Sequence, residues 1–555
     1  MIDVRDVTSA RIVLSGLVST LLAAAVIAAP AHRVVTVQIL SINDFHGALE
    51  PPAGANGRIG DVAAGGAVYL AAHLARDVAA NSNSIIVGAG DLIGASPLLS
   101  SLVHNEPTIE SLNAMHLAVS AVGNHEFDRG WQELLRMQRG GCQPVDGCQG
   151  ARQFTGATFT YLAGNVRRKT PGGEEALFPG TAIRTVGGVK IGFIGETLGA
   201  TAHLLSGAAS KDLEFLDEAS TANRLASSLT QQGVHAIVLL LHQGGAQKPD
   251  DSDVDGCVGF SGGIVPIVAR LSSDIRVVLS GHTHRVYNCT LQGHLVTSAA
   301  SLGRVITRVD LAIDASTDSI TAATARNEIV TRDVPADPVQ VELIRRYARL
   351  AAPIANRPVG ALAGPIVRDV NSAGEGSLGD VIADAELAAG RPLGAQIAFM
   401  NEGGIRADLV SASITYNDVF LVQPFGNTLL VMTVDGRTLK DLLERQFDNP
   451  RPGARRILQV SSGFSYRYTA NAPAGQHVDA ASMMLDGRHI ELGDHLRIVA
   501  SDFLYTGGDG MSEFSRSTDI VSVGPDVDAL ANYVRAHSPL TAPTPNRITR
   551  IDASR

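Results

Sequence analysis

The chain has 555 residues, of which 45% are hydrophobic and 18% are charged, and its formal net charge is -10. This length exceeds what one hydrophobic core usually covers, so we expect more than one domain. The ordinary composition argues against a disordered, fibrous or coiled-coil protein. Binding to a phosphate backbone needs clustered Lys and Arg, so the acidic balance argues against nucleic-acid polymers as partners.

Residues 1–31 have the pattern of a secretory signal peptide. Arg5 and Arg11 precede an apolar stretch from Ile12 to Ala29, which closes on the small residues Ala29-Pro30-Ala31. We expect cleavage after Ala31 and a soluble protein that is secreted, periplasmic or held in the cell envelope. The alternative is an uncleaved membrane anchor, because the apolar run is close to the length that spans a bilayer.

The four cysteines are Cys142, Cys148, Cys257 and Cys289. Because an oxidising compartment favours disulfides, export predicts two bridges and not metal-binding or catalytic thiols. Of the three possible pairings, loop proximity favours Cys142 with Cys148, which leaves Cys257 with Cys289. The second bridge would then lie close to the candidate site.

One arrangement recurs between about Val34 and Asp314: a short apolar run rich in β-branched residues ends on a polar cluster. The runs and the residues that follow them are VVTVQILSI before Asn43-Asp44-Phe45-His46, SIIVGAG before Asp91, AVSAVG before Asn124-His125-Glu126, HAIVLLL before His242, and IRVVLSG before His282-Thr283-His284. Helical patterns around residues 68–80 and 217–232 lie between them. Strands that alternate with helices predict an α/β domain with both sheet faces covered, and ligands bind beyond the carboxyl ends of such strands.

The polar clusters mix carboxylate, imidazole and amide groups, a set that suits divalent first-row metals better than calcium alone. The candidate ligands are Asp44, His46, Asp91, Asn124, His242, His282 and His284. Seven ligands are too many for one zinc-type site and fit two sites that share a carboxylate, the usual device for hydrolysing phosphate esters. We therefore expect two divalent metal ions, zinc, manganese or similar, as cofactors.

A single DxH or HxH pair is weak evidence in a chain with 16 histidines, because each pair alone is more often part of a surface loop. Five clusters at five successive strand ends are stronger evidence, since chance does not place them all on one edge of a sheet. This regularity favours a two-metal site over scattered surface residues.

The motifs NDFHG, GAGD, GNHEFD, LLLHQGG and SGHTH occur in this order. They resemble the calcineurin-like metallophosphoesterase superfamily, and NDFHG with GNHEFD is similar to its 5′-nucleotidase branch, which includes secreted bacterial 5′-nucleotidases and UDP-sugar hydrolases. The resemblance implies an N-terminal β-sandwich flanked by helices. It also implies that one metal is held by Asp44, His46, Asp91 and His284, and the other by Asp91, Asn124, His242 and His282, with Asp91 as the bridge.

His125 directly follows the candidate ligand Asn124, so it cannot easily face the same metal and is free for catalysis. The resemblance implies that His125 contacts the phosphoryl group as charge develops and that Asp128 orients it. A carboxylate bonded to one ring nitrogen raises the basicity of the other and fixes the tautomer. Two alternatives remain: His125 as a structural cap of the following helix, and Glu126 as the support of a metal ligand.

The pattern changes after Ile329. The segment VPADPVQVELIRRYARLAAPIANRP begins with two prolines and then has helical spacing, so residues 331–357 are predicted to form a connecting helix between a metallophosphoesterase domain, 33–330, and a C-terminal domain, 358–555. The C-terminal domain has mixed strand and helix signals, including TLLVMTV, a turn at Asp435-Gly436 and the helix TLKDLLERQF. It contains no metal-binding motif.

Three C-terminal segments, NEGGIR, QPFGN and SDFLYTGGDG, resemble the α/β substrate-binding domain of 5′-nucleotidases. The resemblance implies that Arg406 contacts the phosphate, Asn401 the base and Asp509 the ribose hydroxyls, and that Phe425 and Phe503 sandwich the base. Arg368 is a second candidate phosphate contact, although RDVNSAGEGSLGD departs from the LGN pattern common in the family. Core packing is the alternative interpretation of the two phenylalanines, because most aromatic side chains are buried.

The sequence therefore predicts an α/β enzyme that hydrolyses nucleoside phosphates to nucleoside and phosphate by in-line attack of an activated water molecule. Its expected partner is a small nucleotide, and no oligomeric state is indicated. The alternatives are a UDP-sugar hydrolase, a 2′,3′-cyclic-nucleotide phosphodiesterase and a catalytically silent nucleotide-binding surface protein. The last is disfavoured because every candidate ligand and His125 are present.

Overall fold

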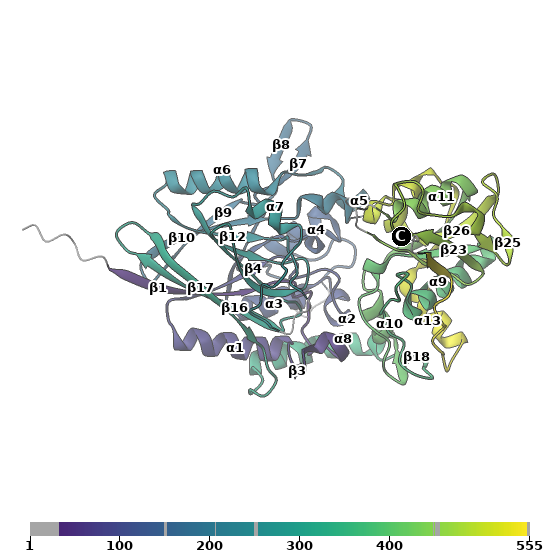
Figure 1. The fold of residues 1–555 in the computed structure, drawn as a ribbon. Helices are drawn as coiled ribbons and strands as arrows, with labels where there is room; N and C mark the ends of the chain where they lie inside the picture. The colour runs from purple at the N-terminus through teal and green to yellow at the C-terminus, as the bar shows by residue number, and fades with distance from the viewer. Residues whose placement is uncertain are drawn as a thin grey trace, which may run out of the picture.

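The computed structural model describes residues 33–148, 153–205, 207–248, 253–447, 449 and 455–551. The expected signal peptide lies outside the described residues. The described chain forms an N-terminal part and a C-terminal part that lie side by side (Figure 1).

Two six-stranded sheets form the centre of the N-terminal part within the described residues. In spatial order the first sheet contains β17 (Ser319–Ile329), β16 (Val305–Asp314), β1 (Val34–Ile42), β4 (Ser84–Ala89), β5 (Leu117–Ala121) and β6 (Thr160–Leu162). The second contains β14 (Val286–Leu291), β15 (His294–Ala299), β13 (Ile275–Ser280), β12 (Ala236–Leu241), β10 (Val189–Glu196) and β9 (Thr181–Val186).

The two sheets pack face to face, and β12 shows why. Every residue of β12 is buried. Val238 and Leu240 belong to the hydrophobic cluster between the sheets, whereas Ile237 and Leu239 belong to the cluster beneath the helices on the outer face. A strand buried on both faces needs such a continuous apolar run, because successive side chains point to opposite sides. The predicted sandwich is therefore built from strands that are apolar throughout.

Helices cover the outer faces of both sheets. They are α1 (Ala67–Ala80), α2 (Leu98–Ser101), α3 (Glu106–Ala114), α4 (Gly130–Arg139), α5 (Gly207–Ser210), α6 (Glu218–Gln231) and α7 (Ile264–Val268). The predicted helices around 68–80 and 217–232 correspond to α1 and α6. Asp217 caps α6, because its side chain accepts a hydrogen bond from the Ser220 N–H.

The strands that carry the polar motifs run parallel in their sheets. β1 pairs in parallel with β4, and β4 with β5, while β12 pairs in parallel with β13. Their carboxyl ends therefore meet at one edge of the sandwich. Smaller strands complete this part: β2 (Arg58–Ile59) with β3 (Val62–Ala63), and the projecting hairpin of β7 (Val166–Thr170) and β8 (Gly173–Ala176) with β11 (Leu213–Phe215).

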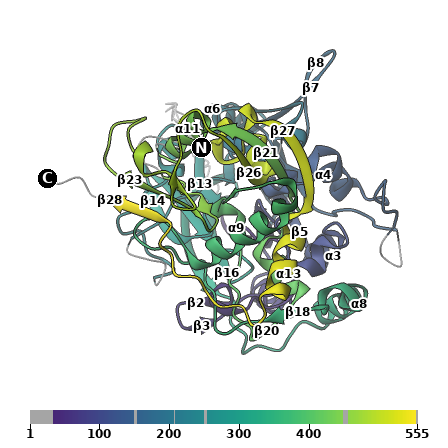
Figure 2. The same cartoon turned by 90° about the vertical axis from the view of Figure 1, so that its right-hand side faces the viewer.

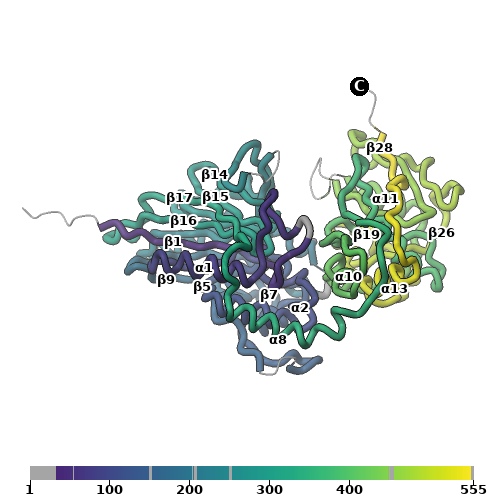
Figure 3. Tube along the Cα trace, turned by 90° about the horizontal axis from the view of Figure 1, so that it is seen from below, coloured from purple at the N-terminus to yellow at the C-terminus, as the bar shows by residue number. Residues whose placement is uncertain are grey.

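Helix α8 (Pro338–Ala355) follows the N-terminal part, where the sequence predicts a connecting helix. Asp337 is its N-cap, and the Asp337 side chain accepts a hydrogen bond from the Gln340 N–H. The helix packs against α1, α2 and α3 and then leads into the C-terminal part (Figure 3).

The C-terminal part contains a mixed sheet in the order β22 (Gln459–Val460), β19 (Ile397–Met400), β26 (His495–Ser501), β21 (Thr428–Asp435) and β27 (Thr518–Pro525). A second sheet contains β25 (Arg488–His489), β24 (Met484–Leu485), β23 (Phe464–Thr469) and β28 (Ile548–Ile551), and β18 (Pro358–Ala361) pairs with β20 (Ser413–Thr415). Its helices are α9 (Ser377–Gly390), α10 (Tyr416–Val422), α11 (Gly436–Arg445), α12 (Asp502–Tyr505) and α13 (Asp526–Ala536). Helices α9 and α13 pack side by side (Figure 2).

The predicted turn at Asp435-Gly436 is the start of a helix. Asp435 is the N-cap of α11 and its side chain accepts a hydrogen bond from the Thr438 N–H, while Gly436 is the first helical residue. An Asp-Gly pair fits both a turn and a helix start, and the apolar spacing that follows decides for the helix.

The predicted disulfide pairing is present: Cys142 is bonded to Cys148, and Cys257 to Cys289. The second bridge ties the segment before α7 to β14. Among the described helices, none is long and apolar enough to cross a bilayer.

Candidate metal and substrate site

The structure brings the seven candidate metal ligands together at the carboxyl edge of the two sheets. They lie in the loops that follow β1, β4, β5, β12 and β13. Five of them have left-handed backbone conformations: Asp44, His46, Asp91, His282 and His284, with φ between 47° and 73°. Such conformations cost roughly 1–3 kcal/mol each in residues other than glycine and cluster at functional sites. The loops are therefore bent to aim these side chains.

Asp44, His46 and His284 form one group that could hold a metal ion. His46 Nε2 lies 3.0 Å from His284 Nε2, and His284 Nε2 lies 3.3 Å from Asp44 Oδ1. His46 Nδ1 donates to the Gly94 carbonyl at 2.9 Å, so Nε2 is the nitrogen left with a lone pair. Burial lowers the pKa of His46 to about 3, which keeps its ring in the neutral form that binds metals.

Asp91, His242 and His282 form a second such group. His242 Nδ1 donates to the Ala89 carbonyl at 2.8 Å, and His242 Nε2 lies 2.9 Å from Asp91 Oδ2. Asn124 belongs to this group by position, because its Oδ1 lies 3.1 Å from both His242 Nε2 and His282 Nδ1.

Asp91 lies between the two groups. Its Oδ2 is 2.9 Å from His242 Nε2 in one group and 3.9 Å from His46 Nε2 in the other, and its Oδ1 accepts from the His125 N–H. Burial alone would raise the pKa of Asp91, but the facing His242 lowers it well below its usual value. Asp91 therefore occupies the position expected of a shared carboxylate.

Glu126 holds the backbone beneath Asp91. Its carboxylate accepts hydrogen bonds from the N–H groups of Asp91, Leu92, Ile93 and Gly123. Burial raises the pKa of Glu126 to about 8. The four backbone N–H groups that donate to its oxygens act in the opposite direction and favour the charged form. Glu126 supports a candidate ligand, which is the second of the two alternatives left open by the sequence.

Gly123 explains why the GNHEFD motif needs glycine before Asn124. A Cβ atom on Gly123 would lie 2.2 Å from Asp91 Oδ1, far inside van der Waals contact. The backbone can therefore approach the shared carboxylate only where no side chain is present.

His125 lies beside both groups without belonging to either. Its Nδ1 lies 3.0 Å from Asp128 Oδ1, so the Asp128 carboxylate accepts from that nitrogen and leaves Nε2 as the working atom. Burial would lower the pKa of His125, but Asp128 and Asp91 raise it above its usual value. This geometry matches the predicted orientation of His125 by Asp128. His125 also begins a short 3-10 turn, so its position is compatible with both interpretations of its role.

A cavity of about 310 Å³ lies against His125. Its walls come from both parts of the chain: Asn124, His125, Asp128, Leu204, Leu205 and His282 on the N-terminal side, and Asn401, Gly403, Gly404, Arg406, Phe425, Gly426, Asn427, Asp502, Phe503 and Asp509 on the C-terminal side. Five of the six predicted substrate-binding residues therefore line one cavity together with candidate metal ligands.

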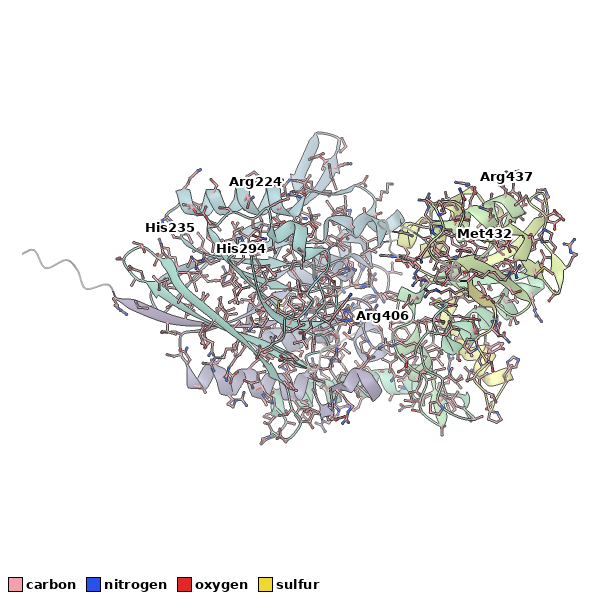
Figure 4. All side chains as sticks on the ribbon, in the orientation of Figure 1. Arg224, His235, His294, Arg406, Met432 and Arg437 are labelled. Atoms are coloured by element: carbon pink, nitrogen blue, oxygen red, sulfur yellow. A yellow bond between two sulfur atoms is a disulfide. The ribbon has the colours of Figure 1, made fainter. Side chains whose placement is uncertain are left out.

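Arg406 lies where the C-terminal part meets the N-terminal part (Figure 4). Burial lowers the pKa of Arg406, while the carboxylates of Asp91, Asp128 and Asp44 act to raise it. Its Cζ lies 5.7 Å from the centroid of the Phe425 ring. The C-terminal part thus places the Arg406 guanidinium in the same cavity as the candidate metal ligands Asn124 and His282.

The two phenylalanines contact different partners. Phe425 stacks on His125 with ring centroids 5.6 Å apart and an interplanar angle of 29°. Phe503 packs on one side against the C-terminal hydrophobic cluster and lines the cavity with another part of its ring. A Cβ atom on Gly508 would lie 2.5 Å from the Phe503 ring, so the GGDG turn lies flat against it.

Asn401 and Asp509 are bonded to each other, because Asn401 Nδ2 donates to Asp509 Oδ2 at 2.8 Å. Arg456 also forms an ion pair with Asp509. Arg368 differs from the other predicted residues, since it is absent from the described cavity lining. Its guanidinium donates to the Arg406 carbonyl and to Asn56 Oδ1, each at 2.9 Å, and so links the two parts of the chain.

Sequence reasoning missed several residues of the site. Asn427 and Asp502 lie inside the motifs QPFGN and SDFLYTGGDG, so the motifs themselves were the available signal. Leu204 and Leu205 belong to no motif, and nothing in the sequence places them against the C-terminal part. Asn43 belongs to the NDFHG motif without an assigned role; its Nδ2 donates to Asp44 Oδ2 at 2.8 Å and steadies that side chain.

The donor set fits divalent first-row metals. Imidazole lone pairs of His46 and His284 face each other at 3.0 Å beside a buried carboxylate, a convergence of acceptors that a shared cation would satisfy. Each group mixes nitrogen and oxygen donors, and backbone carbonyls fix the tautomers of His46 and His242.

Known proteins resemble this chain along most of its length. The family described as 5′-nucleotidase, C-terminal domain matches residues 358–516. The chain is 30% identical over 532 residues to "Cell wall protein Lmo0130" of Listeria monocytogenes, covering 90% of this chain and 67% of that protein. It superimposes on the crystal structure of a 5′-nucleotidase precursor from Thermus thermophilus with a TM-score of 0.77, at 25% identity, covering 94% of this chain and all of that one.

The chain belongs to the 5′-nucleotidase family. The fold class that the sequence predicts for this family, an N-terminal sandwich flanked by helices and a C-terminal α/β domain, is confirmed. This 5′-nucleotidase family member is also 32% identical over 530 residues to "Endonuclease YhcR" of Bacillus subtilis, covering 94% of this chain. It spans only 41% of the length of that relative.

Proposed function

We propose that the protein is a secreted, metal-dependent 5′-nucleotidase that hydrolyses nucleoside phosphates to nucleoside and phosphate. One observation carries the proposal: a single cavity is lined by the candidate ligands Asn124 and His282, by His125, and by Arg406 and two phenylalanines from the other part of the chain. A nucleotide has the matching halves, an anionic phosphoryl group and an aromatic base. The two disulfides support an extracytoplasmic location.

In this proposal residues 33–330 form the metallophosphoesterase domain, residues 331–357 the connection and residues 358–555 the nucleoside-binding domain. Asp44, His46, Asp91 and His284 would hold one divalent ion, and Asp91, Asn124, His242 and His282 the other. Ions bound there would neutralise phosphoryl oxygens and lower the pKa of the attacking water.

The protein's own side chains bind the phosphoryl group and hold a proton near it. Arg406 offers a planar pair of donors that suits phosphate oxygens. His125 directs Nε2 toward the phosphoryl group because its Nδ1–H is bonded to Asp128. A positioned histidine of this kind typically contributes about 10²–10⁴-fold to rate.

The C-terminal side of the cavity holds the nucleoside. Phe503 and Phe425 offer aromatic faces for stacking on the base, and Asp509 is held by Arg456 and Asn401 in reach of ribose hydroxyls. Leu204 and Leu205 exclude water from the N-terminal side of the same cavity. Arg368 acts indirectly by holding the main chain of Arg406.

Chromatographic analysis of the products formed from AMP, ATP, UDP-glucose and 2′,3′-cyclic AMP, with the metals varied, tests the proposal, because UDP-sugar and cyclic-phosphodiester cleavage release no free phosphate in their own step. We expect phosphate from AMP only when a divalent metal is present. Preferred cleavage of UDP-glucose would identify a UDP-sugar hydrolase, and preferred cleavage of 2′,3′-cyclic AMP a cyclic phosphodiesterase. Metal binding without turnover of any of these substrates would identify a silent nucleotide-binding protein.

A further inference from the structure

Two polar side chains without an assigned role line the cavity next to the phenylalanines. Asp502 directly precedes Phe503, and Asn427 lies two residues after Phe425. They lie close together, because β21 starts at Thr428 and pairs with β26, whose last residue is Ser501. The Thr428 N–H donates to Asp502 Oδ1 at 3.1 Å and joins the two segments directly.

Asn427 is oriented by a buried carboxyl group behind it. Its Nδ2 donates to Asp526 Oδ2 at 3.0 Å, and the Asp526 N–H donates back to the Asn427 carbonyl at 3.0 Å. Asp526 is only 2% exposed, so this reciprocal pair is shielded from water. One hydrogen of the Asn427 amide is engaged with Asp526, so the side chain offers its acceptor, Oδ1, and its second N–H elsewhere.

Asp502 contributes acceptors as well. One oxygen is engaged by the Thr428 N–H, and the half-buried carboxyl group lines the cavity. Asp509 has Arg456 as an ion-pair partner, whereas among the ion pairs of the described residues none involves Asp502. The arginine of the described cavity lining, Arg406, has the phosphate-binding role proposed above.

We propose that Asp502 and Asn427 make the enzyme selective for nucleotides whose base carries an exocyclic amino group. The inference rests on the proposed nucleotidase function and names its substrate class. Two neighbouring acceptors complement the two N–H donors of an amino group on adenine or cytosine. Hypoxanthine and uracil carry a carbonyl oxygen in place of that amino group, and this oxygen would face the Asp502 carboxylate, which offers no donor when it is ionised.

The size of the effect follows from the charge on Asp502. Hydrogen bonds to charged groups contribute roughly 1.5–3 kcal/mol, which corresponds to about tenfold to a hundredfold in kcat/KM. A site that binds an N–H rejects an analogue lacking it, because its buried acceptors then stay unpaired. The hydrogen bond gained with an amino group and the unpaired acceptor left without one both favour AMP over IMP and CMP over UMP.

The test compares kcat/KM for AMP with IMP and for CMP with UMP on the full-length, metal-loaded protein. Because burial raises the pKa of Asp502, the measurements are made at about pH 8, well above the usual pKa of a carboxyl group. We expect AMP to exceed IMP, and CMP to exceed UMP, by about tenfold or more. Purine riboside 5′-phosphate, which lacks the amino group without gaining an oxygen, should fall between AMP and IMP. These measurements on the wild type depend on no variant.

Asp502→Asn provides the second arm. The amide keeps an oxygen for the Thr428 N–H and can turn an N–H toward a carbonyl oxygen, so the AMP to IMP ratio should fall toward one. A general loss of activity cancels in the ratio. Asp435→Asn is the matched control, because Asp435 caps α11 at the opposite end of β21 and lies outside the described cavity lining. It should leave the ratio unchanged.

Equal use of AMP and IMP by the wild type, or a ratio that Asp502→Asn leaves unaltered, would overturn the inference while the nucleotidase function stands. Failure of the proposed function has a different signature, in which p-nitrophenyl phosphate is hydrolysed but none of the four nucleotides is.

Discussion

The two sides of the cavity are built in different ways. On the N-terminal side, the candidate ligands follow buried strands, several have left-handed backbones, and their polar atoms are tied to carbonyl or N–H groups of neighbouring strands. On the C-terminal side, Phe425, Phe503 and Asp509 lie on loops and short helices and are partly exposed. Left-handed backbones and full burial are therefore most frequent among the candidate metal ligands, although Asp509 on the C-terminal side also has a left-handed backbone, with φ 54°.

Two buried carboxyl groups at the candidate metal site differ from Asp380 of the C-terminal part. Asp44 and Asp91 face imidazoles that lower their pKa values despite complete burial, so they are ready to bind cations. Asp380 in the C-terminal part is equally inaccessible, and burial raises its pKa to about 8 even though Arg547 is near. Facing imidazoles thus keep these two carboxyl groups charged, whereas burial without such partners holds Asp380 toward its neutral form.

Asp91→Asn should have the largest effect, because it removes the carboxylate that faces both groups. We expect hydrolysis of AMP and of p-nitrophenyl phosphate to fall by about a thousandfold or more, since metal catalysis supplies several kcal/mol. Bound metal, measured by elemental analysis, should fall as well. Exposed Asp274→Asn is the control for an Asp to Asn change. Unaltered turnover of AMP would remove the two-metal interpretation.

His125→Ala should reduce both activities by about 10²–10⁴-fold, because its proposed contact is with the phosphoryl group that the two substrates share. Bound metal should stay at the wild-type level. Asp128→Asn should have the same direction and a smaller size, since the ring keeps its place and loses only the carboxylate on Nδ1. A metal content that falls together with activity would instead make His125 a structural residue.

Phe503→Ala should affect the two substrates unequally. Stacking of a base on an aromatic ring contributes roughly 1–3 kcal/mol, so kcat/KM for AMP should fall by about tenfold to a hundredfold. Hydrolysis of p-nitrophenyl phosphate, which has no nucleobase, should change far less. Parallel loss on both substrates in a protein that melts early would restore the core-packing interpretation of Phe503.

Asp380→Asn should have the smallest effect and act on stability alone. The folded pKa of Asp380 is raised to about 8, above the unfolded value, so its contribution to stability is fully present below about pH 4 and is lost as the pH rises to about 8. Because the amide of Asp380→Asn does not ionise, the variant does not lose stability in this way as the pH rises. Its melting temperature should exceed that of the wild type by a few degrees at about pH 8, and the gap should shrink toward about pH 5.

Exposed Asp61→Asn should leave the melting temperature unchanged at both pH values. A gap for Asp380→Asn that is the same at both pH values would show that its effect comes from packing and not from the buried charge.

The sequence alone was sufficient to predict the strands, the gathering of the candidate metal ligands at one sheet edge and the disulfide pairing. Apolar runs such as AIVLLL can be buried on both faces only as interior strands, and the residues after them must then meet at the sheet edge. Asp44, Asp91 and His242 could be placed together for this reason, because local pattern and parallel pairing determine their positions.

Only the tertiary structure decided how the two parts of the chain meet. Leu204 and Leu205 face the C-terminal part, Phe425 stacks on His125, and Arg368 bonds to Asn56 instead of lining the cavity. These contacts join residues hundreds of positions apart through side chains on loops. The spacing of apolar residues along the sequence does not predict such a contact. The physical reason is that strand positions follow from local burial patterns, whereas a cavity between two parts depends on their packing as whole bodies.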